Sequence, residues 1–318
     1  MNKRKNPVLF QGNKKHNHYF EGWYYKIVSS DKKTTIALIP GISLHEEDTH
    51  AFIQVFISSK ESEDTLQTDY IRFSYEDFSF QDDPFLITIE DNFFSLEQLS
   101  INIKTTTVSL KGTLDITNLT PLKSSIYAPN IMGPFAYFPK MECFHGIVSM
   151  THKLKGKLVF NQKTINFDNS KGYIEKDWGT SFPKEYVWMQ SNHFQDESIS
   201  FMFSYASIPF MRMSFNGLIV VLYHNKREYR FSTYQFAKVI KETLSEKEAY
   251  YQIKQGKYLC EIHAKTDKGV LLTSPIHGEM KNAIKEGLSG LISIKLYHRG
   301  SLVLQDIGLY AGIELMKK

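Results

Sequence analysis

The sequence lacks most of the patterns that mark metalloproteins, nucleotide-binding proteins and membrane-spanning proteins. Its 318 residues include only two cysteines, Cys143 and Cys260, which are far apart and outside any CxxC pair, so a structural zinc site has no support. There is no glycine-rich phosphate loop and no Gly-x-Ser-x-Gly nucleophile motif. No apolar run reaches the roughly 18 residues of a membrane-spanning helix, and the basic N-terminus is not followed by the apolar stretch of a signal peptide. We therefore expect no metal site, no cofactor and a cytoplasmic location.

The net charge is also small. Thirty-eight basic and 34 acidic residues give +4, which is too weak and too dispersed to indicate nucleic-acid binding. The basic residues cluster only at Met1–Lys5 and Lys14–His16. We expect a solvated N-terminal tail there, and at most a peripheral contact with anionic membrane lipid. The sequence leaves the oligomeric state open.

Aromatic and alternating residues are abundant. Phe, Tyr and Trp make up 14% of the chain, which favours strands over helices. Apolar and polar residues alternate with period two in many runs, such as Ala51–Ile57 and Leu291–Tyr297, and this indicates an all-β sandwich or barrel. The only convincing helical segment is Glu279–Leu288. We predict two mostly antiparallel β-barrel domains, 1–165 and 166–318.

One long connection interrupts this pattern. The segment Thr120–Met141 contains four prolines together with several Tyr, Phe and Met residues. Long loops of this kind are often lids or pocket walls. A strap over an open barrel end is an equally good interpretation.

The segment Gly172–Gly179 places two carboxylates on one strand face. In a strand, Tyr173, Glu175 and Asp177 point to one side, and Lys176 and Trp178 to the other. Two like charges on a buried face raise the pKa of at least one of them, which gives the neutral acid that general acid catalysis needs. The alternatives are a solvated face, or neutralisation of one carboxylate by Lys176 or another cation.

Three further groups of residues are candidates for ligand binding. In Tyr19–Lys26, Glu21 and Trp23 share a strand face and Tyr24 lies on the other, although Trp23 also suits simple core packing. In Val187–Phe194, Trp188 shares a face with two amides, which must be hydrogen-bonded by a ligand head group or by an internal network. His145 suits a base or hydrogen-bond donor, or a satisfied core histidine. The two amides of the second group are Gln190 and Asn192.

Several motifs together resemble the tocopherol cyclase family. They run in order from residue 6 to residue 314: Asn6-Pro7 with Phe10-Gln11-Gly12, Tyr19–Lys26, Met132–Phe135, His145–Met150, Gly172–Gly179 with Ser181–Pro183, Val187–Phe194 and Ala311–Glu314. The resemblance implies two lipocalin-like barrels and chemistry on a prenylated quinol. A carboxylic acid would protonate the nearest prenyl double bond, and the phenol oxygen would capture the tertiary cation to close a ring.

These observations combine into one functional hypothesis. We expect acid-catalysed ring closure, or a related alkene protonation, of a lipophilic isoprenoid in an apolar barrel pocket. Asp177 is the expected proton donor, and Glu175 is its electrostatic partner or the alternative donor. The three tryptophans are expected to lie near one another. The alternatives are a non-catalytic lipocalin-like carrier of a lipid or quinone, and a structural double barrel without a ligand. The expected substrate-binding residues are Glu21, Trp23, Tyr24, His145, Tyr173, Trp178, Trp188, Gln190, Asn192 and His193.

Overall fold

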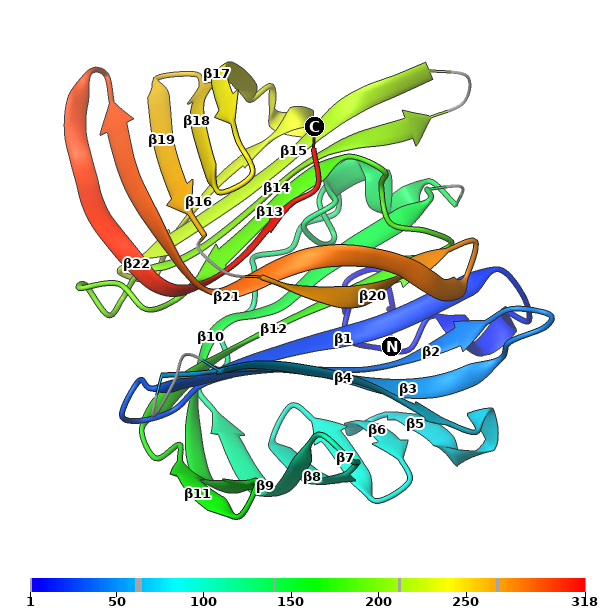
Figure 1. The fold of residues 1–318 in the computed structure, drawn as a ribbon. Coiled ribbons are helices and arrows are strands. Elements are labelled where there is room, and N and C mark those ends of the chain that lie inside the picture. Colours follow the sequence, from blue (N-terminus) through cyan, green and yellow to red (C-terminus); the bar gives the residue numbers. More distant parts are fainter. Residues whose placement is uncertain (1, 61–64, 140, 211–212, 267–268, 318) are drawn as a thin grey trace. The chain divides into compact units, whose positions relative to one another are not determined.

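The chain folds almost entirely into antiparallel strands. The computed structural model describes residues 2–60, 65–139, 141–210, 213–266 and 269–317. By their contacts, these residues form two compact units, the first comprising 1–182 and 272–283 and the second 183–271 and 284–318. The fold is two lipocalin-like β-barrels (Figure 1). The alternating sequence predicts the barrels, and the family resemblance implies their lipocalin-like form.

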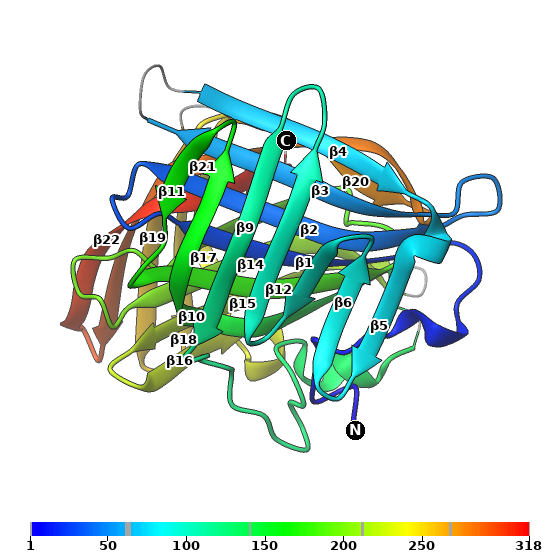
Figure 2. The same cartoon turned by 90° about the horizontal axis from the view of Figure 1, so that it is seen from below.

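The first unit is built on a 12-stranded sheet. Its strand order is β4-β3-β2-β1-β12-β10-β9-β8-β7-β6-β5, with β11 paired to β10. Figure 2 shows β5, β6 and β9 crossing over β1–β4, so the sheet curls back on itself. The strands are β1 (Tyr19–Val28), β2 (Thr34–Leu44), β3 (His50–Ser59), β4 (Thr65–Phe73), β5 (Phe78–Asp82), β6 (Phe85–Ile89), β7 (Asn92–Ser95), β8 (Gln98–Lys104), β9 (Ser109–Thr117), β10 (Cys143–Phe160), β11 (Lys163–Asn166) and β12 (Ser170–Gly179).

The second unit contains most of a 10-stranded sheet. Its order is β16-β15-β14-β13-β22-β21-β19-β18-β17, with β20 paired to β21. The strands are β13 (Tyr186–Ser191), β14 (Ser200–Phe210), β15 (Met213–His224), β16 (Arg227–Ser232), β17 (Lys238–Leu244), β18 (Glu248–Gln255), β19 (Tyr258–Lys265), β20 (Val270–Ile276), β21 (Glu279–His298) and β22 (Ser301–Leu315).

The predicted helix Glu279–Leu288 is wrong, because this segment begins the 20-residue strand β21. Its Ile284, Glu286 and Leu288 are buried with strand periodicity, so pairing of β21 with β20 and, from Glu286 on, with β22 overrides the helical preference of its Ala, Lys and Glu residues. Helix in the described residues is limited to the 3-10 turns η1 (Gly12–Lys14), η2 (Tyr75–Asp77), η3 (Gly133–Tyr137) and η4 (Thr233–Gln235). None of the described helices is long and apolar enough to cross a membrane.

The contact units divide later in the chain than the predicted boundary at residue 165. Strand β12 follows that boundary but pairs with β1 and β10, so it belongs to the first unit. The hairpin segment 272–283 joins the same unit, where the Ser43 hydroxyl donates to the carbonyl of Gly278 at 2.7 Å. A boundary drawn from chain order alone cannot include a returning segment of this kind.

Each unit has its own apolar core. In the first unit, the core takes Trp23, Tyr25 and Ile27 from β1 and Ile174 and Trp178 from β12. In the second unit, Val187 and Met189 of β13 enter the core, while their neighbours on the strand do not. Because strand side chains alternate, the residues between these positions project from the other face of each sheet.

Candidate active site

Strand β12 has two chemically different faces. We call Tyr173, Glu175 and Asp177 its outward face, because they alternate with the core residues Ile174 and Trp178. The Cα of Asp177 pairs with that of His145 on β10, and Glu175 pairs with Tyr24 on β1. The antiparallel register therefore brings four of the residues singled out in the sequence, Tyr24, His145, Tyr173 and Glu175, to the same patch as Asp177.

The outward face holds a trio of ionisable groups, His145, Glu175 and Asp177. The His145 Nδ1 and Asp177 Oδ1 atoms are 2.8 Å apart, and His145 Nε2 lies 3.6 Å from Glu175 Oε2. The hydroxyl of Tyr173 donates to Glu175 Oε2 at 2.5 Å. The side chain of Glu175 is 5% exposed, that of His145 13% and that of Asp177 24%, so Asp177 is the member most open to a ligand.

His145 carries a proton in this arrangement. Burial alone would lower its pKa, but the carboxylates of Asp177 and Glu175 outweigh burial and raise the pKa to about 9. An imidazolium between two carboxylates also cancels the repulsion expected between Glu175 and Asp177. The neutralising cation that the sequence left open is therefore His145 and not Lys176.

The same trio has the donor types of a metal site, which the sequence analysis did not expect. One ligand atom from each of His145, Glu175 and Asp177 lies within 4.8 Å of the others. Imidazole with carboxylates suits a divalent transition metal. His145 lies between the two carboxylates, with Nδ1 2.8 Å from Asp177 Oδ1 and Nε2 3.6 Å from Glu175 Oε2.

The other side of β12, which we call its core face, contains a closed ion pair. Lys176 pairs with Glu21, and both side chains are fully buried. The Lys176 Nζ lies 4.9 Å from the centroid of the Trp23 ring and 4.8 Å from that of Trp178, within cation–π range. Burial lowers the pKa of Lys176 to about 8, while Glu21 acts against that shift.

The N-terminal segment seals this core-face cluster. The Trp23 indole donates to the carbonyl of Val8 at 2.7 Å, and Lys176 donates to that of Leu9 at 2.5 Å. The Glu21 carboxylate accepts from the Gln11 amide and from the hydroxyl of Tyr19. Two of the expected substrate-binding residues, Glu21 and Trp23, thus lie among structural contacts, and core packing is the interpretation of Trp23 that fits.

Trp178 also lies on the core face, where it stacks on Phe144 with ring centroids 5.5 Å apart. It shares Lys176 with Trp23, so two of the three tryptophans do lie close together. They surround a lysine in the barrel core, however, whereas the carboxylates project from the opposite face. Glu175 and Asp177 therefore lie on the other side of β12 from the two tryptophans.

The remaining predicted residues belong to the second unit. Trp188 and Gln190 are buried on the face of β13 opposite the core. Asn192 and His193 follow the end of β13, and the His193 ring meets that of Tyr310 edge-on at 5.5 Å. Trp188 and Gln190 thus share a strand face as predicted, whereas Asn192 and His193 lie beyond the end of β13.

Sequence reasoning missed a second carboxylate group in this unit. Glu286 and Glu314 are paired neighbours on β21 and β22, and Glu314 also pairs with Trp188. Both are buried, and the Tyr186 hydroxyl donates to Glu314. Glu314 ends one of the family-like motifs, and that motif was the sequence signal that could have identified it. Glu286 was missed because the segment 279–288 was predicted to be a helix.

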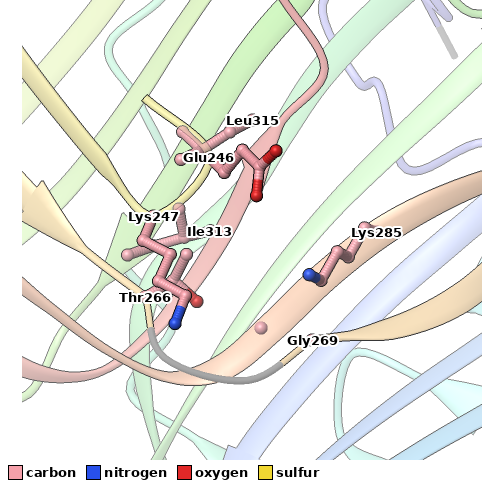
Figure 3. A pocket seen from close by; sticks show the side chains of 8 residues that line it. Glu246, Lys247, Thr266, Gly269, Lys285, Ile313 and Leu315 are labelled. Carbon is pink, nitrogen blue, oxygen red and sulfur yellow. The ribbon is translucent and has the colours of Figure 1, made fainter. Parts of the chain in front are cut away.

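A small pocket opens in the second unit but does not suit a lipophilic substrate. Its volume is about 30 Å³, room for one or two water molecules. Figure 3 shows charged groups from Glu246, Lys247 and Lys285 around it. None of the catalytic or substrate-binding residues predicted from the sequence lines this pocket.

Comparisons with known proteins fix the family of the chain and its fold. CghA in complex with Sch210972 has a TM-score of 0.58 at 8% identity, covering 94% of this chain and 89% of CghA. Kievitone hydratase from Nectria haematococca has a TM-score of 0.54 at 11% identity, covering 98% and 94%. A Nitrosomonas europaea protein assigned as AttH has a TM-score of 0.52 at 13% identity, covering 93% and 92%.

Sequence comparison gives a more specific result. No curated protein matches the chain. The family model described as tocopherol cyclase-like matches residues 128–315, a span that includes His145, Glu175 and Asp177. Since this match covers more than half of the chain, the protein belongs to the tocopherol cyclase-like family.

Proposed function

We propose that the protein is a cofactor-independent enzyme that protonates an alkene of a lipophilic isoprenoid, closing a ring on a prenylated quinol or adding a nucleophile in a related reaction. The observation that carries this proposal is the His145–Asp177–Glu175 trio, which combines a retained proton with a partly open carboxyl group. Family membership and the fold shared with kievitone hydratase support it.

In this mechanism Asp177 donates a proton that it takes from the His145 imidazolium. One of its oxygens accepts the hydrogen bond from His145, which leaves the other free to face the substrate. Glu175, held by Tyr173, favours return of the proton to His145 at the end of each cycle.

The atoms of the reaction balance without a redox partner. The alkene π electrons take the proton from Asp177 and form a C–H bond, leaving a tertiary carbocation. The phenol oxygen then attacks that carbon, forms the C–O bond and loses its proton to the Asp177 carboxylate. Tyr24 and Tyr173 lie beside the trio, and an aromatic face stabilises a nearby cation by about 0.5–2 kcal/mol.

The direct test uses a prenylated hydroquinone in detergent micelles and measures chromanol by mass spectrometry. Asp177→Asn keeps the shape of the side chain and removes the acid, so turnover should fall by about 10²–10⁴-fold. Glu47→Gln is the matched control, because Glu47 is an exposed carboxylate away from the trio. Undiminished turnover by the Asp177→Asn protein would remove Asp177 from the mechanism.

The carrier alternative predicts a different pattern. The wild-type protein would retain the hydroquinone through gel filtration without converting it, and Asp177→Asn would leave this binding unchanged. Mass spectrometry of lipids that co-purify with the protein would then identify the cargo.

A further inference from the structure

Four large apolar side chains project from the loop that precedes β10. Ile126 is 75% exposed, Tyr127 84%, Tyr137 45% and Phe138 43%. The hydroxyl of Tyr137 donates to the carbonyl of Ile126 at 2.5 Å, so the two exposed pairs are held next to each other. Exposed apolar groups gathered at one place mark an interaction surface, whereas single ones do not.

The base of this loop is anchored in the first unit. Ile131, Met132 and Ala136 are buried, and Asn130 accepts from the backbone amide of Met132 at 2.8 Å. The exposed side chains therefore stand on a fixed support. Of the two interpretations of Thr120–Met141, a lid or a strap, the buried half of the segment fits a strap, and the exposed half needs another explanation.

The basic N-terminus lies against the same loop. The side-chain amide of Asn130 donates to the carbonyl of Arg4 at 2.9 Å, and the Arg4 guanidinium lies over the Tyr137 ring, 5.5 Å from its centroid. Arg4 and Lys5 are exposed beside it, and Lys123 is exposed within the loop. Residues 1–20 and 120–139 contain no aspartate or glutamate, although Asp82 pairs with the neighbouring Lys3 at 3.5 Å.

We propose that this surface, formed by Ile126, Tyr127, Tyr137, Phe138 and the adjoining Arg4 and Lys5, docks the protein on an anionic lipid bilayer. Basic side chains attract anionic head groups, and Tyr with short apolar side chains suits the boundary between head groups and acyl chains. An acidic protein partner would match the charge but not the projecting Ile126 and Phe138. The inference goes beyond the proposed reaction and does not depend on it.

The test is co-sedimentation with vesicles of phosphatidylcholine containing about 30% phosphatidylglycerol. The wild-type protein should bind these vesicles, and raising the salt to roughly 0.5 M should weaken the binding. The double variant Ile126→Ser, Tyr127→Ser should bind at least about tenfold more weakly, because it removes the most exposed apolar area. Arg4→Glu with Lys5→Glu should lose the preference for anionic over pure phosphatidylcholine vesicles.

Phe236→Ser is the matched control, since Phe236 is 86% exposed but lies in the second unit, and its binding should equal that of the wild type. Circular dichroism verifies that each variant is folded. Failure of the wild type to bind, or equal binding by the Ile126/Tyr127 variant, would overturn the proposal. Light scattering that shows self-association lost in that variant, with vesicle binding unchanged, would instead make the surface an interface between copies of the chain.

Discussion

The two faces of strand β12 contain similar residues in opposite states. Each combines a carboxylate, a cation and aromatic rings. On the core face, Glu21 and Lys176 are fully buried, and their remaining contacts go to backbone groups and rings. On the outward face, Asp177 keeps a quarter of its side chain exposed beside the protonated His145.

From this difference we infer a structural role for the core-face cluster and a catalytic role for the outward-face trio. A carboxylate whose oxygens are occupied by Lys176, Gln11 and Tyr19 holds the N-terminal segment in place and has no capacity left for a ligand. A carboxylate with one bonded oxygen and one open side can exchange a proton with a substrate. Alternation along the strand is what places the two kinds of cluster a single residue apart.

The largest effect should come from breaking the core-face pair. Lys176→Met leaves the Glu21 charge buried without its cation, and removal of one partner of a buried ion pair costs about 3–5 kcal/mol. Urea denaturation should show this loss. The double variant Glu21→Leu, Lys176→Met should recover part of it, because no buried charge remains. A loss below about 1 kcal/mol, as for an exposed pair, would contradict the closed-pair description.

The next effect is a loss of stability at alkaline pH that depends on His145. Its pKa is raised from 6.5 to about 9, so its stabilising contribution is complete below pH 6.5 and is lost as the pH rises through 9. That contribution is at most about 3 kcal/mol. The His145→Gln protein should show a flatter stability profile over this window. Parallel profiles for the two proteins would show that His145 is not protonated in the fold.

A smaller effect with the opposite sign is expected from His152 on the same strand. Burial lowers its pKa to about 3, and neither ring nitrogen has a hydrogen-bond partner among the described residues. Stability is therefore retained above pH 6.5 and lost as the pH falls towards 3, by about 2 kcal/mol at pH 5. His152→Leu should remove this acid sensitivity. If the His152→Leu protein lost as much stability below pH 6.5 as the wild type, His152 would lie in a polar environment.

The same strand alternation explains what could be predicted from the sequence. Aromatic, period-two segments gave the all-β class, and parity alone placed Tyr173 with Glu175 and separated both from Trp178. The prediction for segment 279–288 failed because its charged residues favour a helix locally, whereas pairing with the neighbouring strands β20 and β22 makes it extended.

The site was only partly predictable, because cross-strand register is not a local property. His145 was visible as a candidate, but its contact with Asp177 depends on the pairing of β10 with β12. The Glu21–Lys176 pair needs the register of β1 with β12 in the same way. The motifs therefore identified the strands that carry these side chains, but they did not show which side chains contact one another across the strands.

We propose that the outward face of β12 performs chemistry and that its core face supports the fold. Matched carboxylate-to-amide variants on the two faces, Asp177→Asn and Glu21→Gln, test it when turnover of a prenylated hydroquinone per folded molecule is measured beside stability in urea. We predict that Asp177→Asn loses turnover by about 10²–10⁴-fold with a stability change near 1 kcal/mol. Glu21→Gln should instead keep its turnover per folded molecule and lose more stability than Asp177→Asn. Full turnover in Asp177→Asn together with lost turnover in folded Glu21→Gln would contradict this assignment of roles to the two faces.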